Sequence, residues 1–171
     1  MKYLGLVGQK SVGKDTAYDA LKAYYGTAVA RLSFADELKR EVCELLGMDI
    51  DKLEANKNLP PVRKLLQEYG VWRRSQTANY WLLRADQVAF PPAVKLVVVT
   101  DCRFLNEAAW ILNMGGSLVR ITRPSLLADD THITETEQTG ISVDYTIFND
   151  QTKLRLEKQI VDYVKNYAKL I

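Results

Sequence analysis

Short apolar runs alternate along the chain with stretches in which apolar residues recur at helical spacing. The apolar runs predict strands. They cover residues 3–7, 28–32, 94–99, 118–122 and 145–148. The run at 94–99 is rich in valine, which is typical of a strand buried on both faces at the centre of a sheet. The alternation of strands and helices predicts an α/β fold, with a parallel sheet that carries helices on both faces.

The helical patterns lie between and after these strands. They cover residues 16–25, 35–46, 61–69, 79–89, 107–113 and 152–170. Gly26 and Gly47 are expected to end the first two helices, because glycine readily takes the left-handed conformation that follows a helix. Pro61 can begin the third, since the N–H that proline lacks is not needed in a first turn. Residues 49–58 are polar and are predicted to form a loop.

Residues 123–144 form a long polar segment without clear periodicity. A structureless segment of this length is uncommon in a compact domain unless it serves a function. We therefore predict that residues 123–144 are a lid. No internal repeat or linker interrupts the chain, and 171 residues are expected to form a single domain.

The charge of the chain is nearly balanced, with 23 basic and 21 acidic residues. It lacks the broad basic footprint that a nucleic-acid backbone attracts, so no nucleic-acid partner is expected. No apolar run is long enough to span a membrane and no signal-peptide pattern opens the sequence, so a cytoplasmic protein without a membrane partner is expected. Cys43 and Cys102 have no metal-like spacing, and we expect both to be reduced packing residues.

The clearest chemical signal is GQKSVGKDT at residues 8–16, which follows a predicted strand and opens a predicted helix. This pattern is typical of a phosphate-binding P-loop. Phosphate oxygens need inward N–H donors at close approach, which glycines permit, and the positive end of a helix. An ordinary glycine-rich turn would leave Lys14 unexplained, whereas a P-loop lysine bridges the β- and γ-phosphates of ATP. The residues expected to bind ATP here are Gly8, Lys10, Ser11, Val12, Gly13, Lys14, Asp15 and Thr16.

Asp15 stands where a P-loop ordinarily has the Ser or Thr that ligates Mg²⁺. The aspartate could hold the metal directly or through water, since Mg²⁺ prefers oxygen ligands and keeps several waters. Equally, Asp15 is an acidic residue in the first turn of a helix, where the helix dipole favours a negative charge. Thr16 is a candidate donor to an α-phosphate.

Six blocks of the chain together resemble the deoxynucleoside monophosphate kinases of tailed phages, within the P-loop nucleotide-kinase superfamily. The blocks are GQKSVGKDT, SFADELK, RKLLQEYGVWRR, VVVTDCRFLNEA, GGSLVRITRP and DYTIFND. The resemblance implies a five-stranded parallel sheet in the order 2-3-1-4-5. It also implies transfer of the γ-phosphate of ATP, with Mg²⁺, to a (deoxy)nucleoside monophosphate for DNA precursor synthesis. The location would be the host cytoplasm if a phage encodes the chain.

The same resemblance implies roles on the acceptor side, with residues 34–90 as the monophosphate-binding region. The residues implied are Phe34, Asp36, Lys39, Arg63, Gln67, Arg103, Glu107 and His132. Arg63 and Gln67 are four residues apart and share one helical face, so they could address a phosphate and a base edge together. Structural roles are the alternatives for three others: Phe34 in the core, Lys39 on a solvated helix and Glu107 near a helix cap.

Catalysis is implied for residues that follow the predicted strands. Asp101 ends the central strand, where open α/β sheets place ligands, and it is the second candidate for orienting Mg²⁺. Arg103 and Arg123 are implied, together with Lys14, as the charges that stabilise the transferring group, with Arg123 at the lid entrance. Asn149 follows the last strand, where the superfamily holds the donor adenine.

Two other functions remain open at this point. A small-molecule kinase of the dephospho-coenzyme A or phosphomevalonate type would share the loop and the lid and would differ in its acceptor. A non-enzymatic ATP-binding sensor would share the loop, but it has no need for Lys14, Arg103 and Arg123 as a clamp. A homodimer is also possible, because one of the three tryptophans could lie at an interface.

Overall fold

The computed structural model of the protein describes residues 1–125, 137–169 and 171. The chain divides into two compact units. Unit 1 comprises Met1–Leu32 and Phe90–Ile171, and unit 2 comprises Ser33–Ala89. Unit 2 has nearly the same bounds as the predicted monophosphate-binding region, residues 34–90. The prediction of a single domain stays a prediction.

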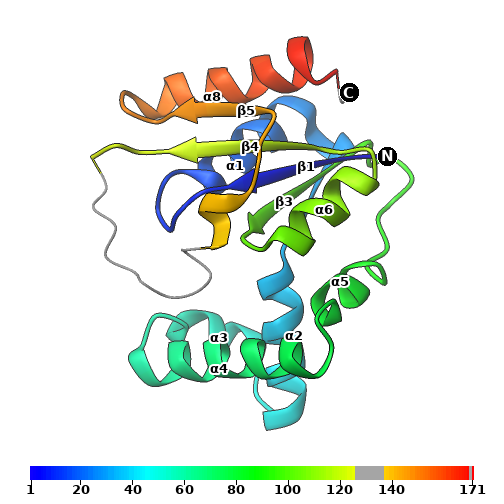
Figure 1. The fold of residues 1–171 in the computed structure, drawn as a ribbon, viewed down its shortest axis with the longest axis vertical. Helices are drawn as coiled ribbons and strands as arrows, with labels where there is room; N and C mark the ends of the chain where they lie inside the picture. Colours follow the sequence, from blue (N-terminus) through cyan, green and yellow to red (C-terminus); the bar gives the residue numbers. More distant parts are fainter. Residues whose placement is uncertain (126–136, 170) are drawn as a thin grey trace. The chain divides into compact units, whose positions relative to one another are not determined.

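Unit 1 contains a parallel sheet with helices packed against it (Figure 1). Its strands are β1 (Lys2–Val7), β2 (Val29–Leu32), β3 (Leu96–Cys102), β4 (Ser117–Thr122) and β5 (Tyr145–Phe148). Its helices in the described residues are α1 (Lys14–Tyr25), α6 (Leu105–Asn113) and α8 (Lys153–Asp162). The strand order β2-β3-β1-β4-β5, with every pairing parallel in the described part of the chain, confirms the predicted α/β fold and its order.

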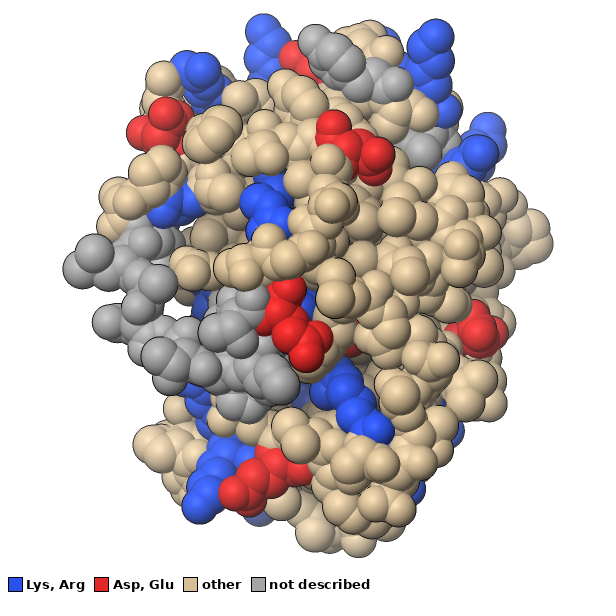
Figure 2. Space-filling model, viewed as in Figure 1, with Lys and Arg blue, Asp and Glu red and all other residues tan. Residues whose placement is uncertain are grey.

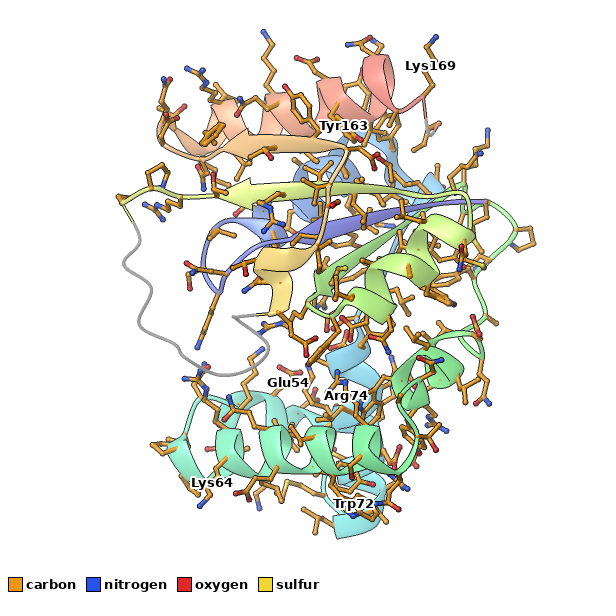
Figure 3. The ribbon with its side chains drawn as sticks, in the orientation of Figure 1. Glu54, Lys64, Trp72, Arg74, Tyr163 and Lys169 are labelled. Atoms are coloured by element: carbon orange, nitrogen blue, oxygen red, sulfur yellow. The ribbon has the colours of Figure 1, made fainter. Side chains whose placement is uncertain are left out.

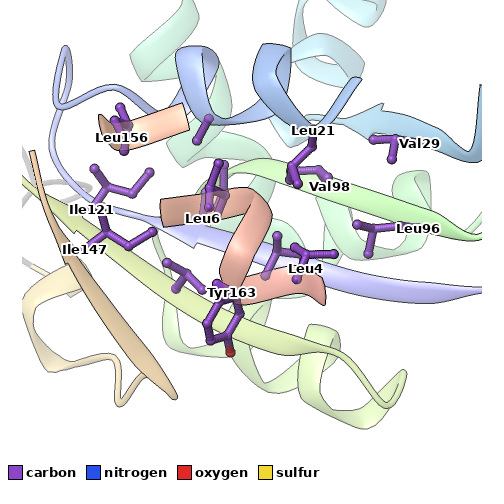
Figure 4. Close-up of a cluster of buried hydrophobic side chains, with 14 of the residues drawn as sticks. Leu4, Leu6, Leu21, Val29, Leu96, Val98, Ile121, Ile147, Leu156 and Tyr163 are labelled. Atoms are coloured by element: carbon purple, nitrogen blue, oxygen red, sulfur yellow. The ribbon is translucent and has the colours of Figure 1, made fainter. Parts of the chain in front are cut away.

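The two faces of the sheet are covered by different helices. Side chains alternate along a strand, so neighbouring residues of β1 point to opposite faces. Leu4 and Leu6 belong to a buried cluster that α1 and α8 complete (Figure 4). On the other face, the ring of Tyr3 packs edge-on against Trp110 of α6, with the ring centroids 5.2 Å apart. The sheet therefore lies between α1 and α8 on one side and α6 on the other.

Unit 2 lies wholly within the described residues and is helical. Its helices are α2 (Phe34–Leu46), α3 (Ile50–Asn56), α4 (Pro60–Gln76) and α5 (Tyr80–Ala85). One cluster of its buried residues consists of Val42, Cys43 and Leu53, against which residues of α2 and α4 pack.

Helix α3 occupies most of residues 49–58, so the prediction of a loop there was wrong. Asp49 caps the helix, because its Oδ1 accepts hydrogen bonds from the backbone N–H groups of Asp51 (2.7 Å) and Lys52 (3.3 Å). In this seven-residue helix only Leu53 is buried, at 2% exposure. One apolar contact leaves almost no helical periodicity in the sequence, which explains the error.

Other helices differ in length from their predictions. α4 continues to Gln76 instead of ending near residue 69, because Gly70 lies buried inside the helix rather than ending it. α5 ends at Ala85 instead of residue 89. α8 ends at Asp162 and is followed by a π-helical turn at Tyr163–Tyr167. Of the predicted lid, residues 126–136 lie outside the described residues, and Gln138–Gly140 form a 3₁₀ turn.

On the face shown in Figure 2, basic and acidic residues lie in small groups separated by uncharged ones. None of the helices in the described part of the chain is both long and apolar enough to cross a membrane. Cys43 and Cys102 are free and buried, as predicted.

Candidate phosphate-binding site

Residues 8–13 join β1 to the N-terminus of α1. Three of them have positive φ angles: Gly8 (149°), Ser11 (66°) and Gly13 (111°). A side chain at Gly8 would place its Cβ 2.4 Å from the carbonyl oxygen of Ile121 in β4, so only glycine fits there. Turns of this kind collect successive backbone N–H groups around a concavity that attracts anions.

Lys14 is the first residue of α1, and its ammonium group lies against the loop. Its Nζ donates hydrogen bonds to the carbonyl oxygens of Gly8 (2.5 Å) and Gln9 (2.7 Å). The lysine is only 9% exposed, so its charge is held at the loop instead of extending into solvent. A held cation beside the positive end of a helix attracts a polyphosphate.

Other predicted site residues lie at the same edge of the sheet as the loop. The parallel register pairs Val7, the last residue of β1, with Cys102 of β3 and Arg120 of β4. The predicted residues at the ends of these neighbouring strands are Asp101 and Arg103 at β3, Arg123 after β4 and Asn149 after β5. Ligands of open α/β sheets bind at the carboxyl ends of the strands, which is this edge.

Asp15 and Asp101 are the two carboxylates predicted to bind Mg²⁺. Asp15 is exposed in the first turn of α1, and Asp101 is half-buried as the second-last residue of β3. In the described residues no group of three or more His, Cys, Asp and Glu side chains could hold a metal. Mg²⁺ commonly takes one or two carboxylates and completes its shell with phosphates and waters, so two aspartates would suffice as protein donors. Binding of Mg²⁺ by Asp15 and Asp101 stays a prediction.

Glu107 caps helix α6. Its Oε2 accepts hydrogen bonds from the backbone N–H groups of Arg103 (2.8 Å) and Phe104 (3.1 Å), and the residue is 2% exposed. The carboxylate therefore satisfies N–H groups at the start of the helix, as the structural alternative expected. Its role in substrate binding stays a prediction.

Arg120 and Arg123 differ in their surroundings. Arg120 donates from Nη2 to the carbonyl oxygens of Gln138 (3.1 Å) and Ile141 (2.6 Å), so it ties the 3₁₀ turn region to β4. Arg123, just beyond β4, is exposed. The catalytic role predicted for Arg123 stays a prediction, and His132 lies outside the described residues.

In unit 2 the predicted residues Phe34, Asp36 and Lys39 all lie near the start of α2. Phe34 is buried at 3% exposure, which agrees with a core role. Lys39, 8% exposed, donates to Oδ1 of Asp36 (2.7 Å) and pairs with Glu54 of α3. Burial lowers the pKa of Lys39, but its bonds to the two carboxylates outweigh burial and raise the pKa above its ordinary value. Lys39 is thus no solvated helix residue, because it joins α2 to α3.

Arg63 and Gln67 share one side of α4 and are both half-buried. Gly70 and Arg74 continue that side at helical spacing. Figure 3 shows Arg74 on the opposite side of α4 from the exposed Trp72. Recognition of a phosphate or a base by Arg63 and Gln67 stays a prediction.

Sequence reasoning missed Glu41, a carboxylate only 6% exposed in unit 2. It accepts hydrogen bonds from the hydroxyls of Tyr69 (2.5 Å) and Tyr80 (2.7 Å) and pairs with Arg73. The Arg73 guanidinium also lies 4.7 Å from the Tyr80 ring centroid. We call these four residues the Glu41 cluster. The sequence did contain a signal for a buried carboxylate, because Glu41 lies three residues after Leu38, within the apolar stripe of α2.

The pKa of Glu41 reflects this environment. Burial raises the pKa of the carboxyl group, but the hydrogen bonds from Tyr69, Tyr80 and Arg73 outweigh burial and lower it below its ordinary value. The cluster therefore holds a charged carboxylate between α2, α4 and α5.

A phosphate loop at the edge of a parallel sheet in this strand order defines a P-loop kinase fold. A family model described as deoxynucleotide monophosphate kinase matches residues 47–160. The chain is 31% identical over 195 residues to a protein of Acanthamoeba polyphaga mimivirus. That protein is named, provisionally, as a deoxynucleotide monophosphate kinase. The match covers 99% of this chain and 100% of that protein. The chain belongs to the deoxynucleotide monophosphate kinase family.

The solved structures add information about the fold. Shikimate kinase from Aquifex aeolicus matches with a TM-score of 0.52 and 16% identity, and the match covers 98% of each chain. At this identity the likeness shows the fold alone. The family membership confirms the resemblance to deoxynucleoside monophosphate kinases and the predicted function of nucleotide phosphoryl transfer.

Proposed function

We propose that this protein uses ATP and Mg²⁺ to phosphorylate a free deoxynucleoside monophosphate, giving the diphosphate for DNA precursor synthesis. The observation that carries the proposal is the loop of residues 8–13, with Lys14 held against it by two carbonyl oxygens. In this proposal the substrate is a mononucleotide in the cytoplasm, and neither nucleic acid nor a membrane takes part. A homodimer stays a prediction.

The donor polyphosphate would bind to the N–H groups of the loop and to the N-terminus of α1. The ammonium of Lys14 is already at the loop, and it would exchange its bonds to Gly8 and Gln9 for bonds to the β- and γ-phosphate oxygens. Because a held cation needs little reorganisation when charge moves during transfer, this arrangement favours the transition state.

Arg103 and Arg123 follow β3 and β4 at the same edge of the sheet and would offset the charge of the transferring group. Mg²⁺, when held by Asp15 and Asp101, would neutralise further phosphate charge. The acceptor phosphate is ionised at neutral pH, so the protein need supply neither a nucleophile nor a general base. The task of these residues is to bind, orient and neutralise.

The test is ADP formation by the purified protein with ATP and Mg²⁺, in the presence of each deoxy- and ribonucleoside monophosphate in turn. We expect at least one deoxynucleoside monophosphate to raise turnover far above the rate without an acceptor. Lys14→Ala should lower kcat by about 100-fold or more, since it removes a charge aimed at the reacting phosphate.

Lys158→Ala is the matched control, because Lys158 is an exposed lysine of α8 and the same side chain is removed. Its turnover should equal that of the wild type. Omission of Mg²⁺ should abolish turnover. If ATP binds but no monophosphate stimulates turnover, the proposed substrate is wrong, and equal activity of Lys14→Ala and Lys158→Ala would contradict the proposed site.

A further inference from the structure

The side chain of Asn149 contacts the phosphate loop directly. Its Nδ2 donates a 2.8 Å hydrogen bond to the carbonyl oxygen of Val12, 137 residues earlier in the chain. The backbone N–H of Asn149 donates to the carbonyl oxygen of Thr122 at 2.7 Å, which anchors the residue to the end of β4. Asn149 thus holds the loop from a fixed position on the sheet.

The bond to Val12 determines how one loop peptide is oriented. None of the described peptide bonds is cis, so the Val12–Gly13 peptide is trans. In a planar trans peptide the C=O and N–H groups point in opposite directions. Because Asn149 holds the Val12 carbonyl on its own side, the N–H of Gly13 points to the other side, away from Asn149.

The surroundings of Gly13 leave no room for a side chain. A Cβ at Gly13 would lie 2.7 Å from Cδ2 of Leu156 in α8 and 2.9 Å from Nδ2 of Asn149. Gly13 also has a φ of 111° and directly precedes Lys14, the first residue of α1. Leu156 of α8 and Asn149 after β5 therefore lie close to Gly13.

We propose that Asn149 is a positioning residue that sets the Val12–Gly13 peptide so that the Gly13 N–H serves as a phosphate donor. This inference rests on the proposed function, because it assigns the Gly13 N–H to the donor polyphosphate. In this proposal the Asn149 side chain donates to a carbonyl oxygen of the loop, and backbone N–H groups of the loop bind the nucleotide. Without that bond the peptide can rotate and turn its carbonyl oxygen toward the phosphate, which repels it.

Asn149→Asp tests the proposal with almost no change of shape, because it replaces the donating NH₂ by an oxygen that repels the Val12 carbonyl. We expect the dissociation constant for ATP to rise about tenfold or more, which corresponds to losing one hydrogen bond to a charged group. The KM for ATP should rise by a similar factor, while the dissociation constant for the deoxynucleoside monophosphate stays unchanged.

Asn166→Asp is the control for the added charge, because Asn166 is exposed in the turn after α8. Asn149→Ala removes the donor without adding a charge, and it replaces Asn149→Asp if that variant does not fold. The Gly13 amide resonance in a ¹⁵N–¹H spectrum gives a readout that a purely structural role would not move. It should shift on addition of ATP in the wild type and in Asn166→Asp, and only weakly in the Asn149 variants.

The outcomes separate this inference from the proposed function. If the wild type fails to bind ATP, the proposed function fails. If the wild type binds ATP and both Asn149 variants bind it equally well, with the same Gly13 shift, the positioning role is overturned. Equal weakening of ATP and monophosphate binding would also overturn it, since a general loss of structure would then explain the result.

Discussion

The phosphate loop of unit 1 and the Glu41 cluster of unit 2 hold charged groups in two different ways. The loop uses backbone conformation within residues 8–13, and it leaves no room for a Cβ at Gly8, which would lie 2.4 Å from the carbonyl oxygen of Ile121 in β4. The Glu41 cluster uses side chains from three helices around one carboxylate. The loop therefore depends on the absence of side chains, whereas the cluster depends on charge and hydroxyl groups.

The largest effect is expected from Gly8→Ala in the loop. The new Cβ would lie 2.4 Å from the carbonyl oxygen of Ile121, a backbone atom of β4 that cannot withdraw without distorting the sheet. We expect the free energy of unfolding to fall by about 3 kcal/mol, from overpacking and backbone strain together. Urea unfolding at neutral pH measures this loss, and ATP binding should be lost with it.

Gly47→Ala separates backbone strain from the steric contact. Gly47 has the left-handed conformation, with a φ of 59° and a ψ of 34°, but a Cβ there would meet nothing within 4 Å. This variant should lose about 1 kcal/mol, the cost of a left-handed conformation alone. If the two Gly→Ala variants lose similar amounts of free energy of unfolding, the closeness of residue 8 to β4 adds nothing to stability. The comparison drawn above between the loop and the Glu41 cluster would then fail.

A smaller effect is expected from Glu41→Ala in the cluster. The hydroxyls of Tyr69 and Tyr80 and the guanidinium of Arg73 lose their shared acceptor. We expect the free energy of unfolding to fall by about 2 kcal/mol, the scale of hydrogen bonds to a charged group. ATP binding by the folded protein should remain, in contrast to Gly8→Ala.

Glu44→Ala is the matched control for Glu41→Ala, because Glu44 is exposed on the same helix and the change in helix propensity is the same. It should alter the free energy of unfolding by less than about 0.5 kcal/mol. An equal loss in both variants would mean that the buried cluster adds nothing beyond helix propensity.

The smallest effect is a pH dependence that belongs to the cluster. The pKa of Glu41 is lower in the folded protein than its ordinary value of 4.5. Its stabilising contribution is therefore present above pH 4.5 and is lost as the pH falls through the folded pKa. The difference in the free energy of unfolding between the wild type and Glu41→Gln should be constant near neutral pH and shrink under acid conditions.

Urea unfolding of the wild type and Glu41→Gln at several pH values between 7 and the acid range measures this difference, since glutamine does not titrate. A difference that grows on acidification would mean that burial prevails over the hydrogen bonds and raises the pKa of Glu41. The cluster would then hold a protonated carboxyl group instead of a charged one.

Sequence patterns predicted the features whose determinants are contiguous. The five strands and the P-loop at residues 8–16 were found because each depends on neighbouring residues. Helix α3 was missed because a short helix with one buried residue leaves no periodicity. The bond from Asn149 to Val12 joins residues 137 positions apart, and no local pattern could have indicated it.

The amino-acid sequence alone established the α/β class, the phosphate loop and, through resemblance, the kinase family. These follow from local backbone preferences and from short blocks of residues. Folding decided which polar side chains became partners: Lys39 with Glu54, Glu41 with Tyr69, and Asn149 with the loop. A polar group removed from water must find a partner, and packing between distant segments determines which partner is within reach.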